Sequence, residues 1–347
     1  MLNLLQKLLK PKYQGAHVDT RSAEEKAKDW QATEVMAFGM PQFRAVKENE
    51  WKKYNVRNQD GSGSCVANSQ AKYMEVRYTL EHARSIEFSH TPVYINRANR
   101  PQAGMGFPDA PKLQIKYGAC LESYLPSQNK TDAQLDATTL PADYEMNNDH
   151  IHAENFVAVP IDFYSVANFV EQNGACVIWI ISDYANWNKD IPTVGGKAVG
   201  NVRHAICAVD AVTLNGVQYL VIEDSWGKFG KYNGQRLITA EFFKDACFVA
   251  YGFLNFTYDE EQGSFEPFLV PLQFGNKGAE VKRLQDYLKS KGVFPSNQTS
   301  TGNYGNITAQ AVLAFQIRYK VDNLNTLNAL KGRYVGRKTL QAINNNL

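Results

Sequence analysis

The sequence predicts an α+β protein with a small helical domain at its C-terminal end. A run of good helix formers without glycine or proline, residues 66–84, follows Cys65. Apolar, strand-like runs occupy residues 204–212 and 219–222. Beyond Gly278, apolar residues recur at helical spacing in three separate segments. We therefore expect mixed helices and strands first and a three-helix bundle last.

Composition limits the classes of partner. The 347 residues are 44% hydrophobic, so the chain can bury a large core and form two domains. A formal net charge of +2 argues against a nucleic-acid partner. No segment approaches the ~20 apolar residues of a membrane span. The N-terminal "MLNLLQKLLKPK" is a poor signal peptide, so we expect synthesis in the cytoplasm without a recognisable export signal.

The cysteines predict neither disulfides nor a metal site. Five of them are widely spaced without a C-x-x-C pair. Four lie in or beside apolar runs, where free cysteine behaves as a small hydrophobe, and are expected in the core: Cys120, Cys176, Cys207 and Cys247. His150 and His152 lack a convincing third ligand. We expect no metal and no cofactor.

Cys65 differs from the other cysteines in its neighbours. Gly61, Ser62, Gly63 and Ser64 precede it in a turn-like stretch, and the helical run begins behind it. At a helix N-terminus, unpaired amides and the helix dipole favour thiolate over thiol. Cys65 is therefore a candidate nucleophile. The alternative is a buried structural cysteine in a turn.

A histidine and an acidic residue stand at strand ends further along the chain. His204 follows a glycine-rich loop and opens the run "HAICAVDAV". Asp224 and Trp226 follow the run that begins at Tyr219. A carboxylate there would orient the histidine ring, and the tryptophan would shield their hydrogen bond from water. The alternative for Asp224 is a turn cap.

These residues resemble the papain-like cysteine peptidases. "VRNQDGSGSCVANS" places Gln59 six positions before Cys65, as in the family's cysteine motif, and His204 follows 139 residues after the cysteine. "DSWGKFG" is similar to the family's N-S-W-G-x-x-W-G element. "GMGFPDAPKLQIKYGAC" resembles its glycine-rich cleft strand and helix, and "EWKKYNVRNQ" its first segment, with Trp51 in the matching place.

The resemblance implies a two-lobed fold, with a helical lobe and a β-barrel-like lobe, and a set of roles. Cys65 would attack an amide carbonyl, His204 would act as base and then acid, and Asp224 would orient His204. Gln59 and the Cys65 amide would stabilise the oxyanion. The implied substrate-binding residues are Gly104, Gly106 and Trp226.

The chain departs from the family pattern at four places. Ser62 replaces a disulfide cysteine, and Val66 replaces the aromatic residue beside the nucleophile. Asp224 replaces the usual asparagine, so a negative charge should favour imidazolium and move the useful pH range upward. Gly230 arrives one position early, and Phe229 is expected to fill the place of the second tryptophan. These departures leave room for a papain-like domain without activity.

The last eighty residues resemble the peptidoglycan-binding type 1 module. They carry that family's G-x-x-V-x-x-L-Q helix, T-G-x-x-G loop, T-x-x-A-V-x-x-F-Q helix and closing V-G-x-x-T, beginning at Gly278, Thr301, Thr308 and Val335. A lengthened loop, residues 318–336, separates the second and third helices. The resemblance implies affinity for bacterial peptidoglycan through residues 267–347.

The expected organisation has four parts: an N-terminal extension over residues 1–45, a peptidase domain over 46–256, a linker over 257–266 and a wall-binding domain over 267–347. Together these parts predict a cysteine endopeptidase that acts at the bacterial cell wall on wall peptides or wall proteins. Such an enzyme would be endolysin-like or virion-associated, and in that version it would be encoded by a phage. Two alternatives stay open. One is an inactive papain-like binding or structural protein, and the other is a general protease whose last module only docks.

Overall fold

The computed structural model of the chain divides into two compact units, Met1–Tyr258 and Asp259–Leu347. It describes residues 15–36, 38–46, 54–83, 85–142, 144, 151–193, 196, 202–258, 268–295 and 298–344. Trp51, His150 and most of the predicted linker lie outside these residues. Within these residues no helix combines the length and apolarity needed to span a bilayer.

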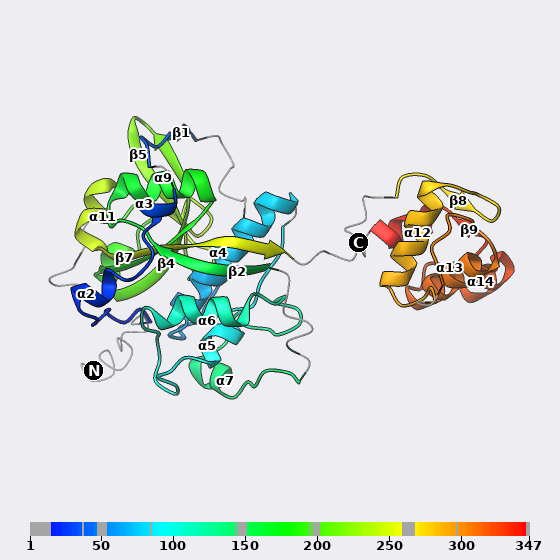
Figure 1. Cartoon of the computed structure of the whole chain (residues 1–347), viewed down its shortest axis with the longest axis horizontal. Helices are drawn as coiled ribbons and strands as arrows, with labels where there is room; N and C mark the ends of the chain where they lie inside the picture. The colour runs from blue at the N-terminus through cyan, green and yellow to red at the C-terminus, as the bar shows by residue number, and fades with distance from the viewer. Residues whose placement is uncertain are drawn as a thin grey trace. The chain divides into compact units, whose positions relative to one another are not determined.

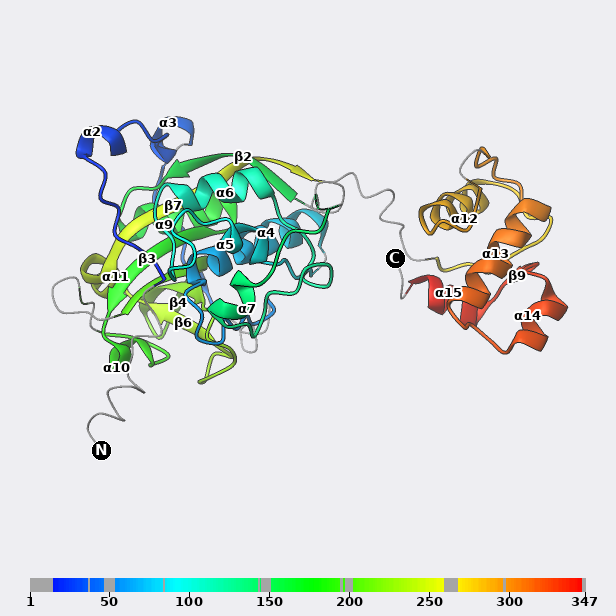
Figure 2. The ribbon, with the colours of Figure 1, turned by 90° about the horizontal axis from the view of Figure 1, so that it is seen from below.

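One lobe of the first unit is helical. Its elements are α4 Cys65–His82, α5 Thr91–Ile95, α6 Asp109–Tyr117 and α7 Asp132–Asp136, which gather together in Figures 1 and 2. Helix α4 begins at Cys65, as predicted, and ends where Ala83 adopts left-handed geometry. Most of its side chains are buried. It is therefore a core helix that holds Cys65 on a rigid element.

The other lobe is built on a seven-stranded sheet with the order β2-β7-β3-β4-β5-β6, to which β1 adds beside β4. The strands are β1 Arg44–Ala45, β2 Ile151–Ala158, β3 Cys176–Ser182, β4 Val202–Leu214, β5 Val217–Glu223, β6 Gln235–Ile238 and β7 Cys247–Tyr258. Three helices accompany the sheet: α9 Phe163–Asn173, α10 Tyr184–Trp187 and α11 Ala240–Ala246. Both predicted strand runs lie inside β4 and β5. The prediction of a helical lobe beside a β-rich lobe is confirmed.

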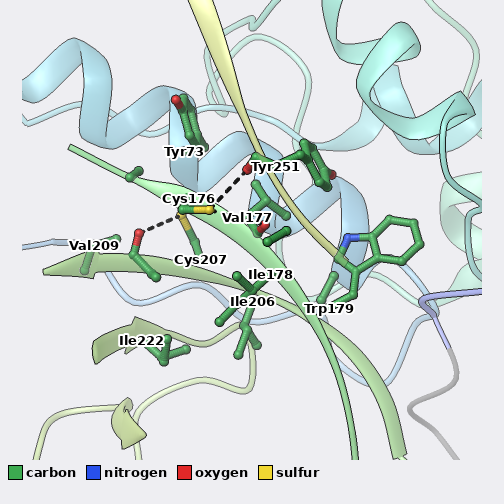
Figure 3. Close-up of a cluster of buried hydrophobic side chains, with 14 of the residues drawn as sticks. Tyr73, Cys176, Val177, Ile178, Trp179, Ile206, Cys207, Val209, Ile222 and Tyr251 are labelled. Atoms are coloured by element: carbon green, nitrogen blue, oxygen red, sulfur yellow. Dashed lines mark hydrogen bonds between the residues drawn. The ribbon is translucent and has the colours of Figure 1, made fainter. Parts of the chain in front are cut away.

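The core lies between α4 and the sheet. Figure 3 shows Tyr73 of α4 above the green strands β3 and β4, with the sulfur atoms of Cys176 and Cys207 among apolar side chains. All five cysteines are free and buried. Burial raises the pKa of the Cys176 and Cys207 thiols, which keeps them protonated. The predicted core location of four cysteines is confirmed.

The described residues of the predicted N-terminal extension pack onto the rest of the first unit. It contains α2 Ala23–Lys26, α3 Ala32–Val35 and strand β1, which runs parallel to β4. Gln31 forms an isolated bridge with Ala158 at the end of β2, and the Ala158 amide donates to the Trp30 carbonyl at 2.7 Å. The extension therefore adds backbone pairing to the sheet lobe.

The second unit has its own hydrophobic core. Its elements are β8 Leu272–Gln273, α12 Ala279–Ser290, α13 Asn306–Arg318, α14 Leu324–Leu330, β9 Tyr334–Val335 and α15 Arg337–Asn344. The three predicted helices correspond to α12, α13 and α15. The lengthened loop contains α14, where the Asn323 side chain caps the helix and Leu327 is buried. A short loop helix of this kind lacks the periodicity that reveals longer ones.

One structural motif occurs twice in this unit. Gln285 donates through Nε2 to the Asn303 carbonyl and the Thr308 hydroxyl, 18 and 23 residues further along the chain. Gln316 makes the same pair of bonds to Tyr334 and Thr339 at the same separations. Gln285 thus ties α12 to the start of α13, and Gln316 ties α13 to β9 and the start of α15. The pattern V-x-x-[LF]-Q, which ends at Gln285 and again at Gln316, is the sequence signature of this internal repeat.

Candidate active site

The loop before α4 places Cys65 beside β4. The Cys65 side chain is fully buried, and its Sγ lies 3.4 Å from the backbone nitrogen of Ala205. The Gly63 amide donates to Asp132 Oδ1 at 2.9 Å, which anchors the loop to the helical lobe. The thiol of Cys65 therefore stands where the two lobes meet.

His204 lies on β4, immediately before Ala205. Its Nε2 is 2.6 Å from Asp224 Oδ1. Burial opposes protonation, but the Asp224 carboxylate and the Cys65 sulfur outweigh it and raise the pKa of His204 to about 9. The sequence placed these three residues together by resemblance, and the fold brings them together.

Asp224 follows the last residue of β5 and is fully buried as a side chain. Besides His204, its Oδ1 accepts the Ser225 amide at 2.7 Å, so it also fixes the local turn. Its Oδ2 accepts from Arg236 Nε at 2.8 Å. Burial alone would raise the pKa of Asp224, but His204 and Arg236 lower it to about 2.

Sequence reasoning missed Arg236. It lies on β6 at a position paired with Ile222 of β5 and is 0% exposed. Its Cζ lies 4.1 Å from the centroid of the Phe229 ring and 4.6 Å from that of Trp187. No local pattern in the sequence distinguishes this arginine from a surface one. Phe229, expected in place of a tryptophan, is part of its aromatic surroundings.

The side chain of Gln59 is held in one orientation. Its Oε1 accepts from Ser225 Oγ at 2.6 Å and its Nε2 donates to the Ser62 carbonyl at 2.5 Å. The Ser62 amide in turn donates to the Gln59 carbonyl at 2.9 Å. Ser62, which stands where the family has a disulfide cysteine, thus closes the loop by hydrogen bonds. With Oε1 occupied, the amide N–H groups of Gln59 point away from Ser225.

Trp226 lies next to the ring of His204, whereas Val66 lies in the core. The Trp226 ring centroid is 5.2 Å from that of His204. Its backbone forms an isolated bridge with Asn58 in the cysteine loop. Val66 is completely buried, so this substitution lies in the core behind Cys65.

Gly104 and Gly106 flank Met105, whose backbone pairs with the chain's own N-terminal segment. The Met105 amide donates to the Gly15 carbonyl at 2.7 Å, and the His17 amide donates to the Met105 carbonyl at 2.9 Å. Gly104 has a φ of +86°, which suits glycine. Backbone pairing therefore occurs in this segment, and Met105 rather than either glycine supplies both groups.

A hollow of about 450 Å³ lies alongside this N-terminal segment. Val18 and Arg21 line it from the extension, and Phe107, Val159 and Val249 line it from the two lobes. The Arg21 guanidinium bonds Asp19 and Asp29 and lies over the Phe107 ring. The extension thus covers one side of this hollow as well as Met105.

The second unit has a smaller hollow of about 310 Å³ beside the start of α13. Uncharged polar side chains and two apolar ones line it: Gln285, Phe294, Gln298, Thr299, Thr301, Asn303, Asn306, Ile307 and Thr308. Ile307 is 42% exposed. Across the described residues, no group of three histidine, cysteine or acidic side chains is arranged to hold a metal ion.

Two family models match the sequence. The papain family cysteine protease model matches residues 41–250, and a peptidoglycan binding domain model matches residues 277–322. Both resemblances noted in the sequence are therefore confirmed. No curated protein matches the chain.

Solved structures share the fold at low sequence identity. Xylellain, a cysteine protease from Xylella fastidiosa, is 15% identical with a TM-score of 0.54, over 70% of this chain and 96% of that one. The cysteine protease and lectin-like domains of Cwp84, a surface layer associated protein of Clostridium difficile, are 16% identical with a TM-score of 0.53, over 75% of this chain. This chain spans 60% of the length of that Cwp84 structure.

Proposed function

The chain belongs to the papain family of cysteine proteases and carries a peptidoglycan-binding domain behind the protease domain, and we propose that it is an endopeptidase acting at the bacterial cell wall. Its nucleophile is Cys65, its base and acid is His204, and Asp224 orients His204. One observation supports this most directly. The fully buried imidazole bonds Asp224 through Nε2 at 2.6 Å, and the Cys65 sulfur interacts with the same ring and helps to raise its pKa.

The proposed reaction has two halves. The Cys65 thiolate attacks the amide carbonyl carbon, a C–S bond forms, and the carbonyl π electrons move onto oxygen. The C–N bond then breaks as the His204 imidazolium gives its proton to the departing amine. Water next attacks the thioester, His204 takes a proton from that water, and the thiolate leaves.

The oxyanion of each tetrahedral intermediate needs fixed donors. We assign the Gln59 side-chain amide and the Cys65 backbone N–H to this role, because Gln59 is held by Ser225 and Ser62 in the loop that leads to Cys65. One such donor contributes about 3 kcal/mol to transition-state stabilisation. Trp226 keeps water from the His204–Asp224 bond.

The C-terminal domain supplies targeting. Even a weak binder joined to an enzyme raises the enzyme's effective concentration at an insoluble polymer. The hollow beside α13 is the proposed contact, since uncharged hydroxyl and amide groups with an exposed apolar side chain suit the amide- and hydroxyl-rich chemistry of peptidoglycan. The substrates are then the stem or cross-bridge peptides of the wall, or proteins embedded in it.

The experiment compares purified peptidoglycan with unfolded casein under reducing conditions and counts new amino termini. The proteins are the full chain, a chain that begins at Ser22, and the Cys65→Ala and Cys120→Ala variants of each. Cys120 is the matched control, because it is another free, buried cysteine. We expect product from peptidoglycan that depends on Cys65 and not on Cys120.

Three other outcomes would overturn the proposal in whole or in part. Product from casein alone would make the chain a general protease with a docking module. Equal activity of Cys65→Ala would remove Cys65 from the mechanism. If neither the full chain nor the chain that begins at Ser22 releases product from peptidoglycan or casein, the result would favour an inactive binding protein.

A further inference from the structure

The carboxylate of Asp224 is shared between two cations. Oδ1 bonds His204 at 2.6 Å and Oδ2 bonds Arg236 at 2.8 Å, and all three side chains are fully buried. A charge in such a place is costly unless another charge is paired with it. Two cationic groups on opposite oxygens compete for the same negative charge.

Arg236 is fixed without help from solvent. Its Nη1 donates to the Lys189 carbonyl at 2.8 Å, and the rings of Trp187, Phe229 and Trp226 surround the guanidinium. The pairing of β6 with β5 places the backbone of Arg236 opposite Ile222, two residues before Asp224. Water cannot screen its charge, so its effect on the Asp224–His204 pair is strong.

We propose that Arg236 is a positioning residue of the active site, which neutralises Asp224 and thereby sets how tightly His204 holds its proton. The inference rests on the proposed Cys65–His204–Asp224 site. Where the family has an uncharged asparagine, this chain has an aspartate. The Asp224–Arg236 pair restores zero net charge beside the proposed thiolate and imidazolium, because its opposite charges cancel.

The other ionisable side chains near this pair have partners of their own. Glu223, at the end of β5, accepts a hydrogen bond from Gln235 and interacts with the charge of Lys72. Asp190 accepts the Lys231 amide at 3.0 Å. Cys65 faces His204 from α4. Among the described residues, Arg236 is the cation besides His204 that bonds Asp224 directly, and its charge is the one that the substitution would remove.

The test is a titration of His204 by NMR, in protein labelled at the histidine Cε1 and assigned with a His204→Gln variant. Removing the cation in Arg236→Gln should raise the pKa of His204 by about one unit or more, since Asp224 then acts unopposed. Asp224→Asn should lower it by at least as much. Adding Arg236→Gln to Asp224→Asn should raise it again. Arg236→Lys keeps the charge and should stay near wild type.

If the role of Arg236 were merely structural, the pKa of His204 would change in the opposite direction. If Arg236 only held Asp224 in place, its loss would weaken the His204–Asp224 bond and lower the pKa of His204. A lowered or unchanged value in Arg236→Gln would therefore overturn the inference. If that variant does not fold, the comparison of Asp224→Asn with the uncharged double variant gives the same sign test. The titration needs no activity, so failure of the proposed function would be seen separately, in the Cys65→Ala comparison.

Discussion

The backbone of Gly15 lies against the sulfur of Cys65. A β-carbon built on Gly15 would stand 2.5 Å from Sγ and 2.4 Å from the Gly63 carbonyl oxygen, so only glycine fits there. Ala16, the next residue, is fully buried and bridges Met105. The N-terminal segment therefore lies against the thiol, at the place where a substrate of the proposed reaction would bind.

Displacing this segment should increase activity. A chain that begins at Ser22 lacks the covering residues, and Gly15→Leu would push them out by overlap. We expect both to hydrolyse peptide and to react with iodoacetamide at Cys65 at least about tenfold faster than the full chain, because the open site is then populated most of the time. Initial rates and the alkylation rate measure this.

The control for this prediction is Gly39→Leu. Gly39 lies further along the same predicted N-terminal extension, outside the residues that cover Cys65, and a β-carbon there would meet nothing within 4 Å. Its rates should equal those of the unchanged chain. Equal rates for all variants would mean that the segment does not cover Cys65 in solution.

Loss of the Gln59 amide should reduce turnover with little change in substrate binding. Gln59→Ala is expected to lower kcat by about 10²–10³-fold while KM stays similar, since an oxyanion donor acts in the transition state. Gln128→Ala is the matched control, because Gln128 Oε1 accepts the Asn58 amide in the same loop at 2.7 Å. If the control loses as much kcat, Gln59 acts through the shape of the loop instead.

The rate should fall at alkaline pH as His204 loses its proton. With a pKa of about 9, the imidazolium that protonates the leaving amine persists through neutral pH and disappears above about 9. Asp224→Asn should move this limit downward. Asp210→Asn, on the same strand as His204 and paired with Arg44, should leave it in place. The pH dependence of kcat/KM measures both.

The stability of the fold should depend on pH through the ionisation of His204 and Asp224. Because the pKa of His204 is raised from 6.5 to about 9, its contribution is complete below about 6.5 and is lost as the pH rises through about 9. The pKa of Asp224 is lowered from 3.8 to about 2, so its contribution is present above about 3.8 and is lost toward about 2. Thermal unfolding midpoints should be highest between these limits; a flat profile would contradict the assignment.

Wall binding should depend on the hollow beside α13. Ile307→Asp is expected to reduce co-sedimentation of residues 267–347 with insoluble peptidoglycan by about tenfold. Ile317→Asp is the control, since both isoleucines are on α13 and 42% exposed, but only Ile307 lines the hollow. Equal loss in both variants would place binding elsewhere on the domain. Failure of the unchanged domain to sediment would remove the targeting role.

The sequence alone was sufficient for several features, for local reasons. Gln59, Cys65, His204 and Asp224 stand at spacings that a motif can hold, and the helix after Cys65 follows from residues with good helix propensity. The helices of the C-terminal unit follow from the 3.6-residue period. The helices depend on neighbours along the chain, and the proposed site residues match a known motif, so both could be predicted from the sequence.

Only the tertiary structure decided which distant residues complete the site. Arg236 bonds Asp224 because β6 pairs with β5, and Gly15 reaches Cys65 because the extension pairs with Met105. Neither residue has a distinctive neighbourhood in the sequence. Strand pairing and packing join residues far apart along the chain, and burial then strengthens their charges and contacts. The sequence thus indicated the proposed nucleophile, while folding determined which cation balances the charge of Asp224 and which segment covers Cys65.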